Sequence, residues 1–173
     1  TADEESSMKG ARSLLNAGRP KARAAIIGEP TSLVPIRMHK GISMFSIKVT
    51  GSTGHSSNPT LGNNALEGMH RAIAQTLKLR DKLKTHYSNS SFDVPSPTLN
   101  LGSIHGGDNP NRICGEVEML FDLRITPDCD YAKIKTELID SLQEISDELN
   151  LAIDLREVMP PVPPFEQERQ SEL

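Results

Sequence analysis

Apolar and polar side chains alternate along several stretches of this chain, as they do in strands that are covered on one face only. In the sequence ISMFSIKVTG, Phe45, Ile47 and Val49 fall on one side, and Lys48 falls on the other side with serine and threonine. We expect the apolar side to face a core and the polar side to meet water. Four strands are predicted in this way, at residues 42–51, 98–104, 113–125 and 151–158.

Helical spacing of apolar residues separates these strands twice. Residues 64–86 carry Leu66, Met69, Ile73 and Leu77 at this spacing, which predicts one helix with these side chains on the core face. The resulting order β-α-β-β-α-β predicts an α+β, ferredoxin-like fold, with a four-stranded antiparallel sheet and two helices on one face. The second helix, residues 130–149, carries Ile134, Leu138, Leu142, Ile145 and Leu149.

The first part of the chain has a different pattern. Residues 6–18 begin with serines and end with a glycine, which predicts a helix, and the apolar run at residues 23–30 predicts a buried parallel strand. A buried strand needs neighbours in a sheet, and the sequence offers none nearby. The chain also begins with Thr1, so we expect it to be a piece of a longer protein.

Composition and charge exclude some classes of function. The net charge is −4 and the lysines and arginines are dispersed, which argues against binding to nucleic acid or to an anionic membrane. Apolar runs are too short to predict a membrane span. Cys114 and Cys129 are too few for a disulfide framework, and two reduced thiols are typical of a cytoplasmic protein.

Two segments contain candidate functional residues, one a histidine and the other three consecutive acidic residues. The loop GSTGHSSNPTLGNN, residues 51–64, is long and rich in glycine and asparagine, and it holds His55. This histidine is either a functional group or an ordinary exposed loop residue. Asp3, Glu4 and Glu5 either stabilise a helix N-terminus or provide a metal ligand beside a general base.

Further candidates lie at the ends of predicted strands. Glu29 follows the apolar run, at the edge where ligands bind in open α/β sheets. Asn111, Arg112 and Arg124 flank the third strand of the predicted sheet, where an amide and a guanidinium group are suited to clamp a substrate carboxylate. A solvated sheet face would have the same composition, so the residues alone leave both interpretations open.

Several of these segments occur together in one known family. The strings TADEESSMKGAR, AIIGEPTS, HKG, VTGSTGHSSNPTLGNNALE and PTLNLGSIHGGDNPNRICGEVEMLFDLR resemble the metal-dependent aminoacylase and exopeptidase family in order and spacing. The resemblance covers nearly the whole chain. It implies an enzyme that hydrolyses an N-acyl amino acid, with two zinc or cobalt ions in an α/β catalytic domain. It also implies a smaller inserted ferredoxin-like domain that forms a homodimer.

The resemblance assigns roles to acidic residues and one histidine of this chain. It implies that Glu4 is the general base and that Glu5 and Glu29 are metal ligands. His55 is implied to reach into the active site of the other subunit and to stabilise the oxyanion there. A protruding loop is well suited to carry a side chain across a subunit interface.

Three more residues receive a role in substrate binding. Asn111 and Arg124 correspond to substrate-carboxylate or oxyanion contacts of the family, and Lys40 of the HKG string is grouped with them. The family's remaining metal ligands, which include histidines and a bridging aspartate, have no counterparts in this sequence. We therefore expect the fragment to hold no catalytic zinc and to be inactive alone.

These considerations divide the chain into three parts. Residues 1–34 are expected to be a fragment of the catalytic domain, residues 35–159 the dimerisation domain, and residues 160–173 a segment returning to the catalytic domain. Two alternatives remain from the sequence. One is an enzyme of the same family with another acyl substrate, such as a desuccinylase, and the other is a stand-alone ferredoxin-like module that binds an amino acid.

Overall fold

The computed structural model describes residues 7–23 and 27–167, in two compact units. In the first unit, Thr1–Arg37 with Gln167–Leu173, α1 (Lys9–Asn16) lies inside the predicted helix. The strand predicted at residues 23–30 is wrong in its described part, because residues 27–30 belong to no strand and Ile27 is 79% exposed. Among the described residues of this unit, 7–23, 27–37 and 167, no strand is present to pair with it, and residues 24–26 lie outside the described part.

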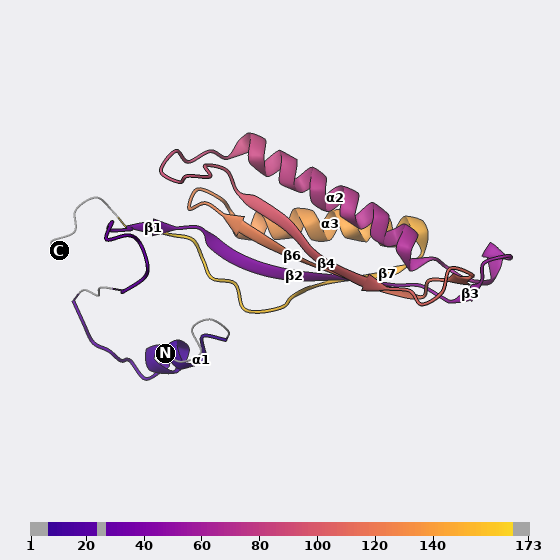
Figure 1. Cartoon of the computed structure of the whole chain (residues 1–173), viewed down its shortest axis with the longest axis horizontal. Helices are drawn as coiled ribbons and strands as arrows, with labels where there is room; N and C mark the ends of the chain where they lie inside the picture. Colours follow the sequence, from indigo (N-terminus) through magenta and orange to yellow (C-terminus); the bar gives the residue numbers. More distant parts are fainter. Residues whose placement is uncertain (1–6, 24–26, 168–173) are drawn as a thin grey trace. The chain divides into compact units, whose positions relative to one another are not determined.

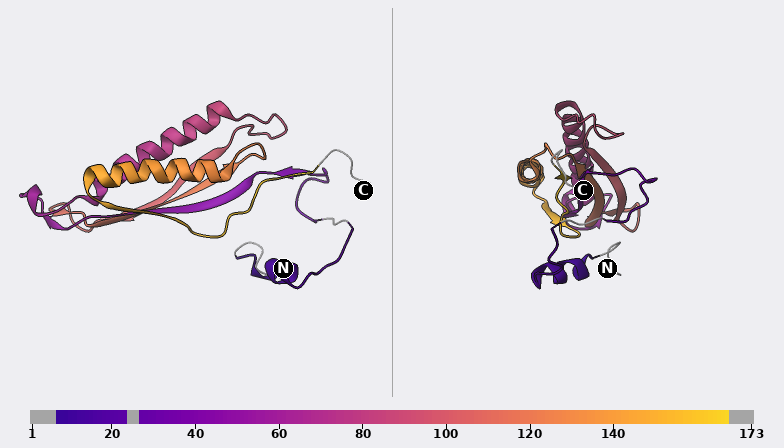
Figure 2. Two further views of the ribbon diagram at one scale, coloured as in Figure 1. Left: turned by 180° about the vertical axis from the view of Figure 1, so that it is seen from behind. Right: turned by 90° about the vertical axis from the view of Figure 1, so that its left-hand side faces the viewer.

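The second unit, Met38–Glu166, contains an antiparallel sheet with two helices on one of its faces (Figures 1 and 2). The helices are α2 (Ala65–His86) and α3 (Tyr131–Leu149). This arrangement confirms the predicted α+β fold with its four-stranded sheet. The strands, in their order across the sheet, are β4 (Thr98–Gly106), β6 (Glu116–Ile125), β2 (Gly41–Thr50) and β7 (Ala152–Glu157).

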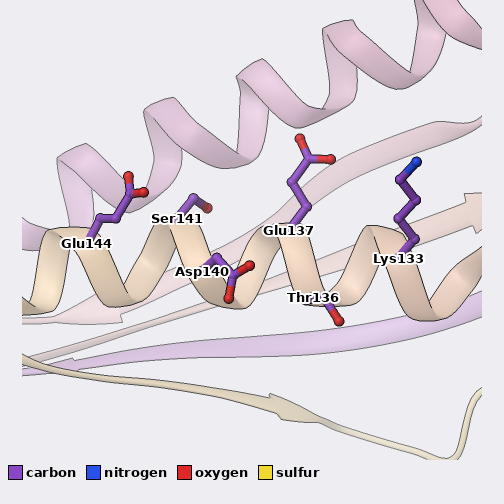
Figure 3. A pocket seen from close by; sticks show the side chains of 6 residues that line it. All are labelled: Lys133, Thr136, Glu137, Asp140, Ser141 and Glu144. Atoms are coloured by element: carbon purple, nitrogen blue, oxygen red, sulfur yellow. The ribbon is translucent and has the colours of Figure 1, made fainter.

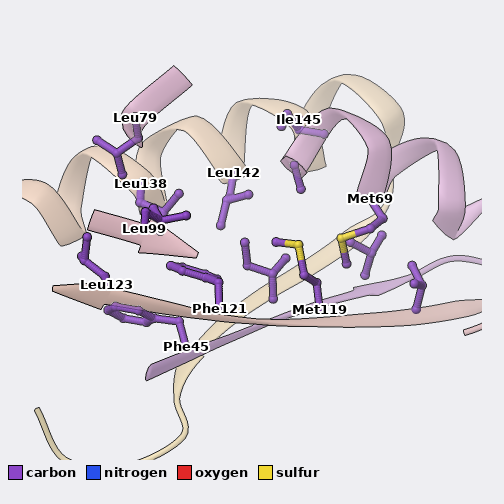
Figure 4. Close-up of a cluster of buried hydrophobic side chains, with 14 of the residues drawn as sticks. Phe45, Met69, Leu79, Leu99, Met119, Phe121, Leu123, Leu138, Leu142 and Ile145 are labelled. Carbon is purple, nitrogen blue, oxygen red and sulfur yellow. The ribbon is translucent and has the colours of Figure 1, made fainter. Parts of the chain in front are cut away.

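The hydrophobic core lies between the sheet and the helices (Figure 4). Phe45, Ile47 and Val49 of β2 are each at most 1% exposed, as their alternation with polar residues predicted. Phe45 stacks on Phe121 of β6 with ring centroids 5.1 Å apart. Because the sheet has only one face under the helices, period-two patterning was sufficient to identify the residues of its inner side.

The core face of α2 differs from the predicted one. Met69 is buried, but Leu66 is 45% exposed and Ile73 and Leu77 are only partly buried. Small residues occupy the core face instead, because the helix lies close to the sheet: a Cβ atom on Gly68 would come within 3.1 Å of Val49 Cγ1. The buried residues of α2 are Ala65, Gly68, Met69, Ala72, Thr76, Leu79 and Leu83.

Ion pairs join α2 to α3 on one flank of α2. Arg71 contacts Glu148 at 2.6 Å, and Lys82 contacts Glu137 at 2.6 Å. The displaced apolar residues Leu66, Ile73 and Leu77 lie on the opposite flank, because they are rotated from Arg71 and Lys82 by more than a quarter turn of the helix. For α3 the prediction is confirmed for Ile134, Leu138, Leu142 and Ile145, which are buried, and Leu149 is partly buried against the core.

Short strands extend both ends of the second unit. β1 (Met38–His39) pairs with β8 (Phe165–Glu166) at one end, and β3 (Gly54–His55) pairs with β5 (Arg112–Ile113) at the other end (Figure 1). We call the β3–β5 end the tip and the end of the sheet near Lys40 and Arg124 the base. Among the described residues, no helix is long and apolar enough to cross a membrane.

Candidate functional site

Two predicted site residues, His55 and Asn111, are brought together at the tip. In the β3–β5 pair, Gly54 lies opposite Ile113 and His55 lies opposite Arg112. The backbone N–H of Ser56 donates to the carbonyl oxygen of Asn111 at 3.0 Å. Two segments that are more than 50 residues apart in the sequence thus form one surface.

The imidazole of His55 is exposed and held on one side by its own loop. Its Nδ1 lies 2.8 Å from the hydroxyl oxygen of Ser57 and 3.2 Å from the backbone nitrogen of the same residue. Ser57 received no role from the sequence, where the only signal was a serine two positions after the histidine. The histidine is therefore presented to solvent with a defined orientation.

Arg112 lies on the same side of the β3–β5 pair as His55, because residues directly opposite in an antiparallel pair point to the same face. Its guanidinium group forms an ion pair with Asp108. Arg112 and Asp108 line an open pocket of about 550 Å³ together with residues 51–53 and 115–116. A cation and a hydrogen-bonding ring thus lie next to one another on this surface.

The loop before α2 is anchored to the body of the second unit through Asn63. Its side-chain amide donates to the carbonyl oxygens of Leu149 and Asn150 at 2.9 and 2.8 Å. Its backbone pairs with Ser52. Gly51 lies against the same residue, so closely that a Cβ atom would come within 2.1 Å of the Asn63 carbonyl oxygen. This contact fixes where the tip leaves the sheet.

Replacing Gly51 with alanine should therefore lower the free energy of unfolding, by about 1–3 kcal/mol, since a backbone atom has to move to admit the methyl group. Urea unfolding followed by circular dichroism measures the change. Gly102→Ala in β4 is the matched control, because its Cβ atom would meet only Leu120 O at an ordinary 3.5 Å. Equal midpoints for the two variants would contradict the role of the Gly51 contact.

At the base, Lys40 is engaged with the loop at residues 87–97. Its Nζ donates to the carbonyl oxygens of Val94 and Ser96, both at 2.7 Å, and lies 5.6 Å from the ring centroid of Phe92. Burial, and then the positive charge of Arg124, lower the pKa of Lys40. Two of its three donors thus hold a loop, and its role in substrate binding stays a prediction.

Arg124 also lies at the base, where it is opposite Thr98 of β4 and Ile42 of β2. Its Nε donates to Asp122 Oδ2 at 2.9 Å, which leaves both terminal nitrogens of the guanidinium group outside this bond. Those two nitrogens form the edge that binds a carboxylate in bidentate geometry. The position and chemistry suit the predicted role in substrate binding.

The structure separates the predicted catalytic residue His55 and the predicted substrate-binding residues into two groups. His55 and Asn111 lie at the tip, and Lys40 and Arg124 lie at the base, at opposite ends of the sheet (Figure 1). The length of β6 between Glu116 and Arg124 is roughly 26 Å at strand geometry. An acyl amino acid is much shorter, so the two groups of one subunit do not contact the same substrate molecule.

The structure gives little information on the predicted general base, Glu4, and on the predicted metal ligands, Glu5 and Glu29. Glu29 is exposed in the first unit, and Glu4 and Glu5 lie outside the described residues. In the described part of the chain, no group of three or more histidine, cysteine, aspartate or glutamate side chains is arranged to hold a metal ion. The described residues alone therefore do not fit a zinc or cobalt site.

A second open pocket, of about 470 Å³, lies on α3 (Figure 3). Its lining consists only of residues along one exposed flank of this helix, and none of them belongs to the predicted site. The lining residues are Lys133, Thr136, Glu137, Asp140, Ser141 and Glu144.

Comparison with known proteins identifies the ferredoxin-like unit. A family profile described as "Peptidase dimerisation domain" matches residues 37–150. The chain belongs to this family. The match begins one residue before the second unit and includes the tip, the base, both helices and β4, β6 and β2.

Curated relatives of this peptidase dimerisation domain are named acetylornithine deacetylase. The protein from Vibrio cholerae is 46% identical over 166 residues, which cover 96% of this chain and 44% of the relative. The protein from Vibrio parahaemolyticus is 47% identical over the same shares. The chain thus spans less than half of the length of these relatives.

Solved structures with the same fold are more distant in sequence. An amidase of the hydantoinase/carbamoylase family from Burkholderia multivorans aligns with a TM-score of 0.63 at 19% identity, over 77% of this chain and 30% of that protein. The aminopeptidase PepT from Bacillus cereus aligns with a TM-score of 0.57 at 17% identity, over 79% and 34%. These structures support the fold of the peptidase dimerisation domain.

Proposed function

We propose that this chain is part of an N-acyl amino acid amidohydrolase, most specifically acetylornithine deacetylase, which converts N2-acetyl-L-ornithine and water into L-ornithine and acetate. The relatives that carry this name support the proposal, since they cover nearly the whole chain at 46–47% identity. The observation that carries it is the pairing of His55 with the Asn111 segment at the tip of a peptidase dimerisation domain.

In this proposal each active site is composite. The tip of one subunit and the base of its partner contact the same substrate, because the two groups of one subunit are too far apart. β4 is one of the two edge strands of the sheet, and it runs from the base, where Thr98 lies opposite Arg124, to the tip, where Gly106 lies opposite Val117. Antiparallel pairing of two β4 edges about a twofold axis brings each tip to the partner's base.

A twofold dimer through β4 also covers apolar surface. Ile104 of β4 is 48% exposed, and Leu66, Ile73 and Leu77 lie on the flank of α2 that faces away from α3. An edge strand with unpaired backbone groups is a template for pairing with another chain. We call this edge together with these four side chains the dimer face, and we propose that it forms a homodimer.

We expect Ile104→Lys to disrupt the dimer, because the twofold axis places the new charge on the dimer face twice. Burying an unpaired ammonium group in each half of the interface costs several kcal/mol, so the dissociation constant should rise about 100-fold or more. Size-exclusion chromatography with light scattering measures the mass. Ile139→Lys on α3 is the control, since Ile139 is similarly exposed at 44% but lies outside the dimer face. A dimer that persists in Ile104→Lys places the interface elsewhere.

The roles within the composite site follow from donor chemistry. His55 of one subunit donates a hydrogen bond to the oxyanion of the substrate amide, and Asn111 of that subunit contacts the substrate carboxylate together with Arg124 of the other subunit, whose base is supported by Lys40. Glu4 takes a proton from water and returns it to the leaving amine. Two zinc or cobalt ions per subunit belong to the proposed enzyme, with Glu5 and Glu29 among their ligands. The other ligands are proposed to come from polypeptide beyond this chain.

The full-length protein with N2-acetyl-L-ornithine is the direct test, with release of acetate as the measurement. Hydrolysis of this substrate in preference to an N-succinyl diamino acid supports the proposal. Preference for the succinyl substrate would assign the chain to a different enzyme of the same family. Binding of amino acids without any turnover would instead support a binding module.

A further inference from the structure

We propose that Ser57 is a positioning residue that holds the His55 ring in the tautomer with its proton on Nε2. The inference rests on the proposed function for its catalytic meaning, but its structural part concerns only the tip. Both contacts of Ser57 with the ring involve Nδ1: the backbone nitrogen at 3.2 Å and the hydroxyl oxygen at 2.8 Å.

A backbone N–H group donates hydrogen bonds and does not accept them. Nδ1 therefore has to be the acceptor when the Ser57 N–H group contacts it, and an acceptor nitrogen carries no proton. In a neutral imidazole the proton is then on Nε2. In this tautomer the Ser57 hydroxyl group is the donor in its 2.8 Å contact with Nδ1.

The position of Ser57 is itself fixed by the surrounding turn. The backbone N–H of Asn58 donates to the His55 carbonyl oxygen at 3.0 Å, which folds residues 55–58 back over the ring. On one side of this turn Ser56 bonds to Asn111, and on the other side Asn58 caps the short helix η1 (Pro59–Leu61) by accepting from Thr60 N–H at 3.3 Å. The serine thus approaches the ring from a turn anchored at both ends.

The tautomer matters because the two nitrogens have opposite roles. With the proton on Nε2, the exposed nitrogen of His55 is a hydrogen-bond donor, as a developing oxyanion requires. With the proton on Nδ1, Nε2 would present a lone pair to the same negative charge. Ser57 therefore selects the form of His55 that stabilises an oxyanion in the partner's site.

Nuclear magnetic resonance of the histidine side chains tests the inference on the 173-residue chain without any assay of activity. Nitrogen-15 chemical shifts are recorded at a pH at which histidine side chains are neutral. The signals that disappear in His55→Gln are those of His55. We expect a pyridine-type shift for Nδ1 and a pyrrole-type shift for Nε2. In Ser57→Ala the loss of one neutral hydrogen bond should lower the ratio of the Nε2–H tautomer to the Nδ1–H tautomer about fivefold. The chemical shifts of Nδ1 and Nε2 should then move toward each other.

Two variants serve as controls. Ser57→Thr keeps a hydroxyl group and should keep the wild-type shifts, and Ser56→Ala should leave them unchanged, because Ser56 bonds to Asn111 through its backbone only. A pyrrole-type Nδ1 in the wild type would overturn the tautomer assignment, and shifts that do not respond to Ser57→Ala would overturn the role of the serine side chain, because alanine keeps the backbone N–H group.

Kinetics of the full-length protein separate this inference from the proposed function. Ser57→Ala should lower kcat by no more than about fivefold, because kcat follows the fraction of the Nε2–H tautomer, with KM unchanged, and Ser57→Thr should restore kcat. Normal resonance results without hydrolysis of acetylornithine would reject the proposed function and leave the tautomer assignment standing. Hydrolysis at the wild-type kcat in Ser57→Ala would reject the catalytic part of the inference.

Discussion

His55→Ala in the full-length protein should lower kcat by about 100- to 1,000-fold, the cost of removing one oxyanion donor. KM should change little, because the interaction with the oxyanion forms only in the transition state. The structure supports this expectation by presenting an exposed imidazole at the tip, held at Nδ1 by Ser57. Steady-state kinetics with the N-acetylated substrate measure both constants.

His86→Ala provides the matched control for this variant. His86 is an exposed histidine at the end of α2, and its Nδ1 contacts the Lys82 carbonyl oxygen at 2.8 Å. It lies on a helix and outside both the tip and the base, so its loss should leave kcat unchanged. An unchanged kcat in His55→Ala would remove this residue from the mechanism, and a rise of KM alone would make it a binding residue.

Two inactive variants should restore activity when they are combined in one dimer. His55→Ala removes the tip group and Arg124→Ala removes the base group, so neither homodimer has a complete site. A heterodimer has one site in which the intact base of the first copy meets the intact tip of the second. Random assembly makes half of all dimers heterodimers, and each heterodimer has one complete site out of two. Co-expression should therefore recover about a quarter of the wild-type activity.

The double variant His55→Ala with Arg124→Ala, co-expressed with wild type, is the control for subunit exchange. One site of its heterodimer has an intact tip with a damaged base, and the other has the reverse, so activity should come only from wild-type homodimers. Mixed single variants that stay inactive while exchange is demonstrated would show that tip and base act within one subunit. Such a result would be incompatible with the separation of Arg124 from His55 along β6.

The sheet and its inner face could be predicted from the sequence because a period of two leaves one register for the apolar residues. Residues 45, 47 and 49 illustrate this, since a shift by one position would move all three away from the helices to the other face of the sheet. The core face of α2 was placed wrongly, because the largest apolar side chains were assumed to be the buried ones. Gly68 shows the physical reason: where the helix lies closest to the sheet only a small residue fits, and larger residues such as Leu79 and Leu83 are buried farther along the helix.

The sequence was sufficient to propose the candidate site residues, but it predicted only part of how they lie relative to one another. The strands of the tip have two residues each, too few for any periodicity, so the pairing of His55 with Arg112 left no signal in the sequence. The same limit applies to Ser57, whose contact with the ring depends on the turn at residues 55–58. For Lys40, the engagement with Val94 and Ser96 depends on a loop whose path the sequence does not specify.

The edge of β4 has a consequence for how the proposed dimer chooses its partner. Backbone donors and acceptors are the same in every sequence, so pairing through an edge does not by itself distinguish this chain from another enzyme of the same fold in the same cell. Discrimination has to come from side chains that fit one neighbour and clash with another. Leu66, Ile73 and Leu77 are therefore the positions where divergence would keep duplicated enzymes from forming mixed pairs.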